Sequence, residues 1–474
     1  MVLFAVVAPA LSACGNKKYT TTLPVPDMVV KYMLPNTGAP GVTVTVVGEN
    51  FGSDKSHVKV FFDGQEATVT AVTPASISLV VPAIKKTAMV TVQMKGKTSN
   101  GTLFHYKQEE EGGTLTSSGR HWIPLRVKEL NVTKVGQYIR LKDEAILMIA
   151  EGGSKASISR DEGSTWTDYP LFDAQRYNAL SPIVVQMRNG TIVLGFTNGK
   201  EKANWNWNKE THDSPGAELP SYTVRSLDGG KTWQDLVLLH KEWTGMNRDI
   251  KETNEGNVVF ATMKMLHNPG RHAVLTYTSK DNGVSWVASN ILDMGGSGDH
   301  SGTMESTFEQ LKDGRLYMLL RTNWGFFYET FSSDQGLHWS YPVATKISAS
   351  SSPGVLKRLE SGRLALVYND MYQIGKTSYP LLGGDNNLSE VAASWQRREL
   401  VIRFSEDEGK TWTRPQLVAR VYEPEASPID PWDAKKWLSY PQLFEAQKGI
   451  LWITTGHGGL KVKLKEADFA DGDR

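Results

Sequence analysis

Short apolar runs alternate with polar turns along most of the chain. The alternation of apolar and polar residues is plain in residues 42–46, 58–62 and 89–92, which is the pattern of half-buried β-strands. From residue 120 onward, pairs of apolar strands flank short polar turns. Six such hairpin turns stand at Asp143-Glu144, Asn189-Gly190, Glu255-Gly256, Asp313-Gly314, Ser361-Gly362 and Lys448-Gly449. The pattern predicts an all-β protein.

A second pattern repeats among these hairpins. The motif S-x-D-x-G-x-[TSH]-W occurs five times, at residues 159–166, 226–233, 279–286, 332–339 and 405–412. Its aspartates are 67, 53, 53 and 73 residues apart, a spacing typical of a repeat architecture. We expect each Asp to accept hydrogen bonds from backbone N–H groups two residues on, each Gly to adopt a positive φ, and each Trp to pack the turn onto the sheet. The motifs are therefore interpreted as structural turns, not catalytic groups.

The repeated motif resembles the Asp-box, or BNR repeat, of the sialidase superfamily, and the resemblance covers roughly residues 120–470. Members of that superfamily are six-bladed β-propellers. The resemblance therefore implies six blades of about four strands each, assigned to residues 120–474. Each hairpin except the last is followed by an Asp-box. The last blade is expected to close the ring with a strand borrowed from residues 120–130.

A separate all-β unit is predicted for residues 25–106. The phrase P-N-T-G-A-P-G-V-T-V-T-V-V-G-E-N-F-G at 35–52, together with the closing F-H-Y at 104–106, resembles an IPT/TIG domain. The resemblance implies a small immunoglobulin-like β-sandwich, which serves as a spacer or a binding module. Residues 107–119 are charged and then rich in Gly, Ser and Thr, so they are predicted to be a linker.

The first fourteen residues have the composition of an export signal. Residues 2–13 are apolar, and the tetrad L-S-A-C that ends at Cys14 resembles a bacterial lipobox. The resemblance implies that residues 1–14 are a lipoprotein signal peptide with Cys14 as the lipidated residue, and that residues 15–24 are a tether. We therefore expect a protein anchored by lipid in the cell envelope, either periplasmic or surface-exposed.

Composition excludes several function classes. The chain has 52 Lys and Arg against 51 Asp and Glu, so no net field favours a nucleic-acid partner. The single cysteine excludes an intrachain disulfide and a cysteine-based metal site. No phosphate loop, nucleophile elbow or metal-spaced histidine cluster is found, and we expect a monomer with no cofactor and no metal. Five further tryptophans are expected either to stack on sugar rings or to pack between blades. They are Trp205, Trp207, Trp395, Trp432 and Trp437.

Candidate catalytic residues lie where inner strands would converge on one mouth of the propeller. Residues 305–321 resemble the sialidase segment in which a glutamate opens a strand and an arginine closes it. The resemblance implies that Glu305 polarises a tyrosine nucleophile and that Arg321 binds a substrate carboxylate. Tyr440 and Arg397 match the family's Tyr-x-x-Leu and Arg-x-x-Leu segments. They are the expected nucleophile and a second carboxylate-binding arginine.

Two parts of the sialidase site are missing from the sequence. The position of the first-blade arginine is occupied by Val135 and Gly136, and Arg140 lies too close to its turn. The general-acid aspartate has no counterpart in residues 151–158. Candidate replacements are Asp249 and Glu151 for catalysis, and Arg248, Asp299 and His300 for substrate binding.

Three functions fit these features. The leading hypothesis is an exported, exo-sialidase-like glycoside hydrolase that cleaves a terminal, acidic or neutral sugar. A non-catalytic, surface glycan-binding lipoprotein is the alternative, and a polysaccharide lyase is a third. Two carboxyl groups about 5–10 Å apart across the mouth would favour hydrolysis. A single acid among aromatic residues would favour binding, and a Tyr–His pair with a basic rim would favour a lyase.

Overall fold

The computed structural model describes residues 27–107, 112–298, 300–371, 397–422 and 437–469. Within these ranges the regular elements are β-strands and short 3₁₀ helices, without an α-helix, so the prediction of an all-β protein is confirmed. No helix in the described ranges has the length and apolar character needed to cross a membrane.

The amino-terminal domain consists of two sheets that share one core. The first sheet has the order β1 (Val29–Leu34), β3 (Thr43–Glu49), β7 (Ser76–Val80) and β6 (Thr68–Thr73). The second has the order β2 (Thr37–Gly38), β10 (Thr102–Tyr106), β8 (Ala88–Met94), β4 (Val58–Phe62) and β5 (Gln65–Glu66), with β9 (Lys97–Thr98) paired to β8. Alternate residues of β3 are buried, because successive side chains of a strand point to opposite faces. Apolar residues of both sheets meet in a single cluster, as expected of a sandwich.

Six antiparallel sheets follow between residues 113 and 469. The first contains β14 (Gln137–Arg140), β15 (Ile146–Ile149), β16 (Lys155–Ser159) and β17 (Thr167–Pro170). The second contains β18 (Ala179–Gln186), β19 (Ile192–Asn198), β20 (Glu218–Ser226) and β21 (Gln234–Glu242). The third contains β22 (Asp249–Glu252), β23 (Val258–Leu266), β24 (Arg271–Ser279) and β25 (Val287–Ala288).

The last two of the remaining three sheets also gather strands from the start of this region. The fourth contains β26 (Ser306–Gln310), β27 (Leu316–Leu320), β28 (Phe326–Ser332) and β29 (Val343–Ser348). The fifth contains β30 (Val355–Arg358), β31 (Leu364–Asn369), β32 (Glu399–Ser405) and β33 (Gln416–Val421), extended by β12 (His121–Pro124) and β11 (Gly113–Leu115). The sixth contains β34 (Pro441–Gln447), β35 (Ile450–Thr455), β36 (Lys461–Lys465) and β13 (Val127–Glu129). The pairing of β13 with β36 confirms that the last sheet borrows a strand from residues 120–130.

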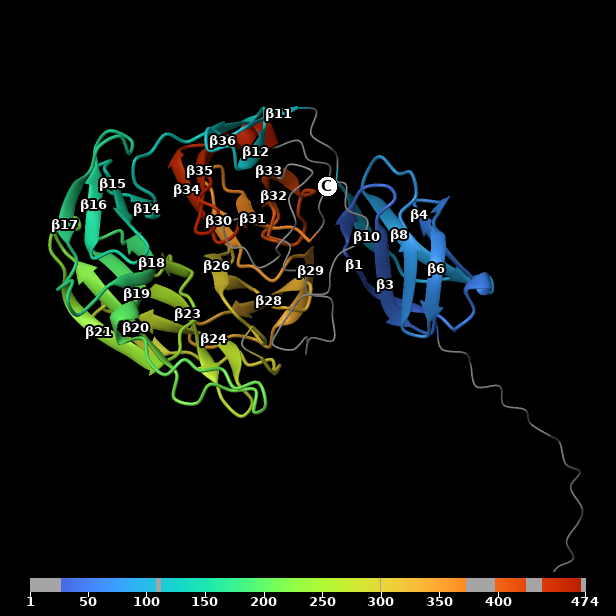
Figure 1. Ribbon diagram of the computed structural model, residues 1–474, viewed down its shortest axis with the longest axis horizontal. Coiled ribbons are helices and arrows are strands. Elements are labelled where there is room, and N and C mark those ends of the chain that lie inside the picture. Colours follow the sequence, from blue (N-terminus) through green and yellow to red (C-terminus); the bar gives the residue numbers. More distant parts are fainter. Residues whose placement is uncertain (1–26, 108–111, 299, 372–396, 423–436, 470–474) are drawn as a thin grey trace, which may run out of the picture.

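The first strand of each sheet lies nearest a common centre. β14 contacts β18, β18 contacts β22, and the contacts continue through β26, β30 and β34 back to β14. Figure 1 shows the sheets fanned around this centre, with β17 and β21 on the outside. All six predicted hairpin turns join the first and second strands of a sheet. The inner strands therefore begin at one end of the ring, which is where the site is built.

The Asp-boxes are the turns between the third and fourth strands of the first five sheets. In the last copy, Asp407 accepts hydrogen bonds from the backbone N–H of Thr411 at 2.8 Å and from its hydroxyl at 2.6 Å. Gly409 has a φ of +83°, and the indole N–H of Trp412 donates to the Gly409 carbonyl at 3.1 Å. The bound N–H lies four residues after the aspartate, not two as predicted. The reason is that Glu408 and Gly409 both have positive φ and curl the chain back over the carboxylate.

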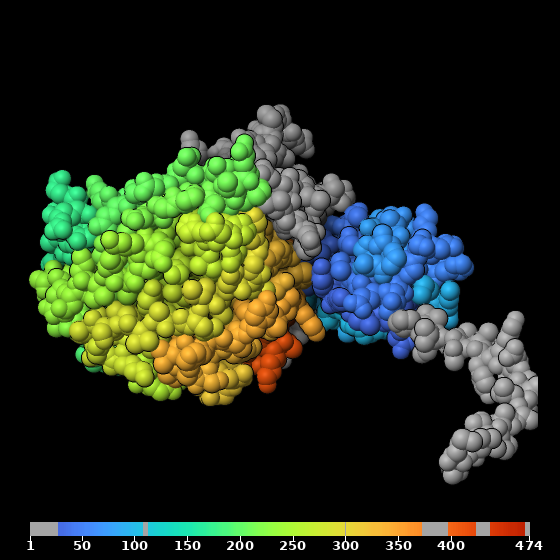
Figure 2. Space-filling model, turned by 90° about the horizontal axis from the view of Figure 1, so that it is seen from below, coloured from blue at the N-terminus to red at the C-terminus, as the bar shows by residue number. Residues whose placement is uncertain are grey.

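The amino-terminal domain packs against the fourth and fifth sheets. Leu34, Phe326 and Met371 form a small buried apolar cluster between them, and Figure 2 shows the blue domain directly beside the orange part of the chain. The segment 107–119 was predicted to be a linker. In the structure it begins at a buried lysine, Lys107, and contains β11, because its G-T-L run pairs with β12. Its described part is therefore built into the fold.

Candidate functional site

The candidate site lies where inner strands begin and second strands end. Arg248, Glu305 and Tyr440 each stand one residue before an inner strand, namely β22, β26 and β34. Arg321 directly follows β27, and Arg397 lies two residues before β32. Three of the five residues thus stand at the start of an inner strand, where the sequence placed the mouth. Antiparallel hairpins bring residues from five different segments together because every hairpin in the ring points the same way.

Glu305, Arg321 and Tyr440 form one hydrogen-bonded group. Nη1 of Arg321 donates to both carboxylate oxygens of Glu305, at 2.9 and 2.7 Å. The Tyr440 hydroxyl donates to Oε1 of Glu305 at 3.1 Å and lies 3.4 Å from Nη1 of Arg321. The side chains of Arg321 and Glu305 are only 2% and 5% exposed. A buried carboxylate thus connects a cation with a phenol.

The electrostatics of this group follow from burial and pairing. Burial alone would raise the pKa of Glu305, but the charges of Arg321 and Arg397 and the hydrogen bonds to the carboxylate together outweigh burial and lower that pKa to about 2. Burial opposes the charge of Arg321, yet the Glu305 carboxylate raises the pKa of Arg321. Burial, and then the charge of Glu305, raise the pKa of Tyr440. At neutral pH the group is therefore a carboxylate, a guanidinium and a protonated phenol.

Two further arginines surround the phenol ring. The guanidinium carbons of Arg248 and Arg397 each lie 5.7 Å from the centroid of the Tyr440 ring. Nη2 of Arg248 donates to the Pro441 carbonyl at 2.7 Å, and Nη2 of Arg397 donates to the Ser351 carbonyl at 2.7 Å. Burial, and then the charge of Arg321, lower the pKa of Arg397 to about 10. The phenol therefore lies among three cations, a setting suited to an anionic ligand.

His457 lies against another edge of the phenol. The two ring centroids are 4.7 Å apart at an interplanar angle of 73°. Nδ1 of His457 shares a 2.8 Å hydrogen bond with the Ser439 hydroxyl, and the Trp437 ring centroid is 5.4 Å from that of His457. Burial, and then the charges of nearby arginines, lower the pKa of His457 to about 4. The imidazole is therefore neutral at neutral pH.

Glu151 provides a second carboxylate at this end of the ring. It follows β15 by two residues and accepts hydrogen bonds from the backbone N–H of Ser181 at 3.0 and 3.1 Å. Its charge acts on Arg248, as does the charge of Glu305. The side chain keeps an exposed face, but partial removal from water raises the pKa of Glu151. The two glutamates therefore have pKa values shifted in opposite directions, the arrangement needed for distinct acid and base roles.

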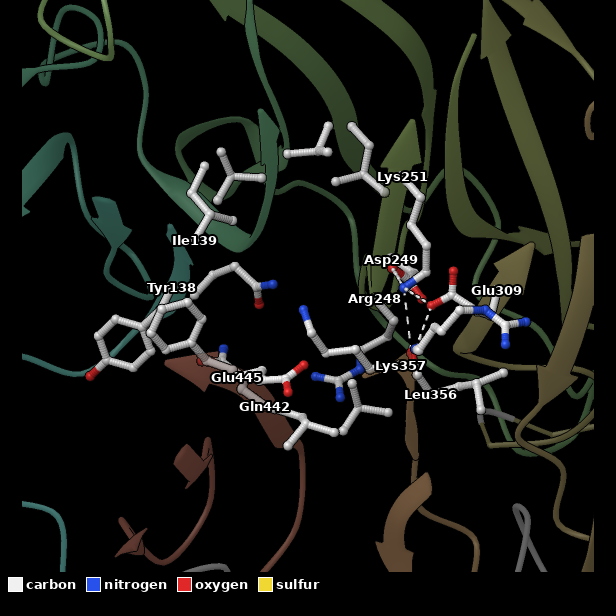
Figure 3. A pocket seen from close by; sticks show the side chains of 18 of the residues that line it. Tyr138, Ile139, Arg248, Asp249, Lys251, Glu309, Leu356, Lys357, Gln442 and Glu445 are labelled. Carbon is white, nitrogen blue, oxygen red and sulfur yellow. Dashed lines mark hydrogen bonds and ion pairs between the residues drawn. The ribbon is translucent and has the colours of Figure 1, made fainter. Parts of the chain in front are cut away.

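Asp249, predicted to be catalytic, lies apart from the phenol. Its Oδ2 accepts hydrogen bonds from the Thr307 hydroxyl at 2.8 Å and from the Phe308 N–H at 3.0 Å. Lys251 lies 3.2 Å from its other oxygen. Figure 3 shows Asp249 and Glu309 converging on Lys251 inside a cavity of about 430 Å³ that runs between the inner strands. The structure thus gives Asp249 the role of bracing β22 against β26.

Gly136 is one of the two residues at the position of the missing first-blade arginine. A Cβ atom on Gly136 would lie 2.1 Å from the carbonyl oxygen of Ile149, so no side chain fits there. Arg140 binds Glu162 at 2.8 and 3.0 Å and the Ala446 carbonyl at 2.6 Å. It therefore points away from the phenol, as its closeness to the turn suggested.

Other predicted residues are placed as follows. His300 is half-buried in the segment between β25 and β26. Asp299 and Cys14 lie outside the described residues, as do two of the tryptophans, Trp395 and Trp432. Trp205 and Trp207 belong to a cluster of rings: the centroid of Trp205 lies 4.1 Å from that of Trp243 and 6.2 Å from that of Trp207.

The sequence did not identify two contributors to the site. The hydroxyl of Ser351 accepts hydrogen bonds from Nη2 and Nε of Arg321 at 3.2 and 3.4 Å. The second contributor is His457, which lies against Tyr440. Their position could have revealed Ser351 and His457, because both lie at the same end of the ring as the other site residues.

Comparison with known proteins defines the family. The sequence profile of the BNR repeat-like domain matches residues 150–453. The chain belongs to this family. The profile of the IPT/TIG domain matches residues 28–106. Both resemblances noted in the sequence are therefore confirmed. No curated protein matches the chain.

Solved structures with a similar fold are distant in sequence. A protein of unknown function from Dyadobacter fermentans is 16% identical, with a TM-score of 0.47, over 72% of this chain and 98% of that one. The NanB sialidase from Streptococcus pneumoniae is 12% identical, with a TM-score of 0.45, over 90% and 84%. An auxiliary nutrient binding protein from Bacteroides ovatus is 12% identical, with a TM-score of 0.37, over 92% and 98%. These likenesses are too distant to carry an argument about function.

Proposed function

We propose that this member of the BNR repeat-like family is a sialidase-like glycoside hydrolase that releases a terminal acidic sugar at the mouth of a six-bladed β-propeller. The hydrogen-bonded group of Glu305, Arg321 and Tyr440 carries the proposal. It joins a nucleophile, a base that can take its proton and a cation that can hold an acidic substrate. The ring of contacts among the six inner strands supports the propeller.

The arginines supply the binding site for a substrate carboxylate. Nη2 and Nε of Arg321 reach the Ser351 hydroxyl only at 3.2 and 3.4 Å. A carboxylate would replace these long bonds with shorter, charge-assisted ones. Arg397 lies beside Arg321, and its lowered pKa reflects their mutual repulsion as well as burial. An anion between the two would relieve that repulsion. Arg248, one residue before β22, supplies a third cation, since the first sheet offers Val135 and Gly136 in place of an arginine.

The proposed reaction has two steps. The Tyr440 oxygen attacks the anomeric carbon, Glu305 takes the phenolic proton, and Glu151 gives a proton to the departing glycosidic oxygen. Water then attacks the same carbon, gives one proton to Glu151, and releases Tyr440, which recovers its proton from Glu305. A substrate carboxylate bound to Arg321 would weaken the pairing that lowers the pKa of Glu305 to about 2, making Glu305 a stronger base. Two displacements retain the configuration of the sugar.

A polysaccharide lyase is a second candidate, because Tyr440 and His457 are in contact beneath a basic rim. In that reaction the neutral imidazole of His457 would take the proton next to a uronate carboxylate that the arginines neutralise. Its product would be an unsaturated sugar, whereas hydrolysis yields two saturated products.

The deciding measurement is the release of reducing sugar from a panel of sialosides and pectic uronides. Glu305→Gln is compared with the wild type, and Lys97→Gln, on the exposed surface of the amino-terminal domain, is the control. Saturated products that disappear in Glu305→Gln alone support the hydrolase. An ultraviolet-absorbing product that disappears in His457→Ala supports the lyase. Binding seen by calorimetry without turnover would identify the glycan-binding protein, and neither binding nor turnover would overturn the proposal.

We also propose that the protein acts as a monomer on glycans in the cell envelope, held to a membrane through lipid on Cys14. The support is the L-S-A-C tetrad after an apolar run. Labelling with radioactive palmitate in a bacterial host tests this proposal. Cys14→Ser should abolish the label and move the protein to the soluble fraction, whereas an unlabelled wild type would contradict it.

A further inference from the structure

A buried group of charges joins the amino-terminal domain to the fifth sheet. Lys107, one residue beyond β10, is 2% exposed, and its amine lies 2.5 Å from Glu399 and 3.3 Å from Asp370. The hydroxyl of Thr37 in β2 donates to Asp370 at 2.8 Å. The two acids are 4% and 0% exposed. Removing one charged member of such a group leaves the others buried without a partner, because no water is available to solvate a buried charge.

A second buried cation contacts the amino-terminal domain. Arg403 is 1% exposed, and its Nη2 donates to Nε2 of His105 at 3.3 Å. Burial, and then the charge of Arg403, lower the pKa of His105 well below its usual value, so His105 is neutral. The buried interface therefore contains two cations and two carboxylates. One of the cations, Lys107, lies at the end of the amino-terminal domain.

The acids of this group are joined to the sugar site through the backbone. The side-chain amide of Asn369 donates to the carbonyls of Glu399 at 2.9 Å and Leu438 at 2.8 Å. The N–H of Leu438 donates to the Arg397 carbonyl at 2.5 Å. Leu438 stands two residues before Tyr440, and Arg397 stands two residues before Glu399. Asn369 is followed directly by the other acid, Asp370. Glu399 thus lies on the segment that carries Arg397, and the neighbour of Asp370 holds the segment that carries Tyr440.

We infer that Lys107 is a positioning residue, through which the amino-terminal domain fixes the backbone that carries Arg397 and Tyr440. A domain attached as a spacer would need no buried ions, since apolar contact or a flexible linker would hold it. The inferred coupling rests on the chain of hydrogen bonds through Asn369 and Leu438. Its effect on turnover rests on the proposed function of the site.

Hydrogen–deuterium exchange on the whole protein tests the coupling without any ligand. The variant is Lys107→Met, which keeps the length of the side chain and removes its charge. The control is Lys97→Met, an exposed lysine of the same domain that pairs with Asp27 at the surface. We expect exchange in residues 397–403 and 437–443 to rise about tenfold or more in Lys107→Met. Exchange in residues 146–159, on a distant sheet, should stay unchanged, as should every segment in Lys97→Met.

Other outcomes overturn the inference. An equal rise in residues 146–159 would mean that Lys107 supports only overall stability, and a rise confined to residues 27–107 would mean that it supports only its own domain. If Lys107→Met does not fold, Thr37→Val removes one hydrogen bond of the same group and should raise exchange in the same two segments by a smaller factor. No rise there would equally overturn the inference.

A kinetic readout separates positioning of the site from anchoring of the domain. With an acidic glycoside that the wild type cleaves, Lys107→Met should raise KM about tenfold, because Arg397 is displaced. The control should leave KM unchanged, and an unchanged KM in Lys107→Met would contradict the positioning role. If the wild type cleaves no glycoside, the proposed function fails, while the exchange experiment still decides the coupling.

Discussion

The Asp-box turns and the mouth of the ring both place carboxylates just outside strand ends, but the two regions satisfy them differently. The oxygens of Asp407 are bound by donors of its own turn, among them the N–H and hydroxyl of Thr411, four residues away. Glu305 is bound by Arg321 and Tyr440, which are 16 and 135 residues away. The hydrogen bonds of Asp407 form within a local turn. Those of Glu305 form only after the ring has closed and brought distant segments together.

The difference separates structural acids from candidate catalytic ones. An Asp-box carboxylate is bound by its own turn and occurs five times in the chain. Glu305 has no repeated equivalent and is bound by two groups that can themselves bind or react with a sugar. The partners of Glu305 can therefore take part in binding or catalysis, whereas those of an Asp-box carboxylate stabilise a turn. Substitutions in the two regions should accordingly affect different observables, namely turnover at the mouth and free energy of unfolding at the turns.

The largest expected effect is that of Tyr440→Phe on turnover. The change removes one oxygen and leaves the ring beside Arg248 and Arg397, so folding should be preserved. We expect kcat to fall by about 10³-fold or more on the best glycoside of the panel, because the nucleophile is lost. Steady-state kinetics and a thermal melt are measured together. Wild-type turnover in this variant would remove the hydroxyl from the reaction and favour the binding function.

Glu151→Gln should have the next largest effect, and it should depend on the leaving group. Without an acid, cleavage of natural glycosides should slow by about 10²-fold or more. Aryl glycosides with acidic phenols should be cleaved nearly as fast as by the wild type, because they need no proton. In the wild type, the alkaline limb of the pH profile should reflect the raised pKa of Glu151, and this limb should vanish in the variant. Equal losses on both substrates would exclude the acid role.

The sequence predicted the turn region far better than the mouth. Each Asp-box is a short, local unit, so residues such as Asp407 could be interpreted without knowing the rest of the fold. Glu305 and Tyr440 were found because the segments around them resemble those of a known family. The buried position of Lys107 depends on how the amino-terminal domain meets the fifth sheet. The contact between Tyr440 and His457 lies within the last hairpin, where the N–H of His457 donates to the Ser439 carbonyl at 3.1 Å. Local patterns carry no information about how separate sheets meet, so the hydrogen bonds from Thr307 and Phe308 to Asp249 could not be predicted either.

The third effect is on stability in acid. The folded-state pKa of Glu305 is about 2, below the ordinary value of 4.5, so Glu305 stabilises the fold above pH 4.5 and loses this contribution as pH falls towards 2. The shift corresponds to about 3 kcal/mol. The wild type should exceed Glu305→Gln by roughly this free energy of unfolding at pH 7. The difference should shrink below pH 4.5, because a protonated glutamate resembles glutamine. Urea denaturation at several pH values measures it, and a difference independent of pH would contradict the ion pair.

Asp407→Ala, which should have the smallest effect, tests the role of the Asp-box turns. The change removes the acceptor of the Thr411 N–H and hydroxyl and leaves the N–H without its partner in the turn. The turn is partly exposed, so water replaces much of what is lost, and we expect the free energy of unfolding to fall by about 1–2 kcal/mol. Turnover per folded molecule should stay at the wild-type level, since Asp407 contacts no residue of the mouth in the described structure. A variant that kept its stability but lost turnover would show that a repeated carboxylate acts in the chemistry, and the division between local and distant acids would then fail.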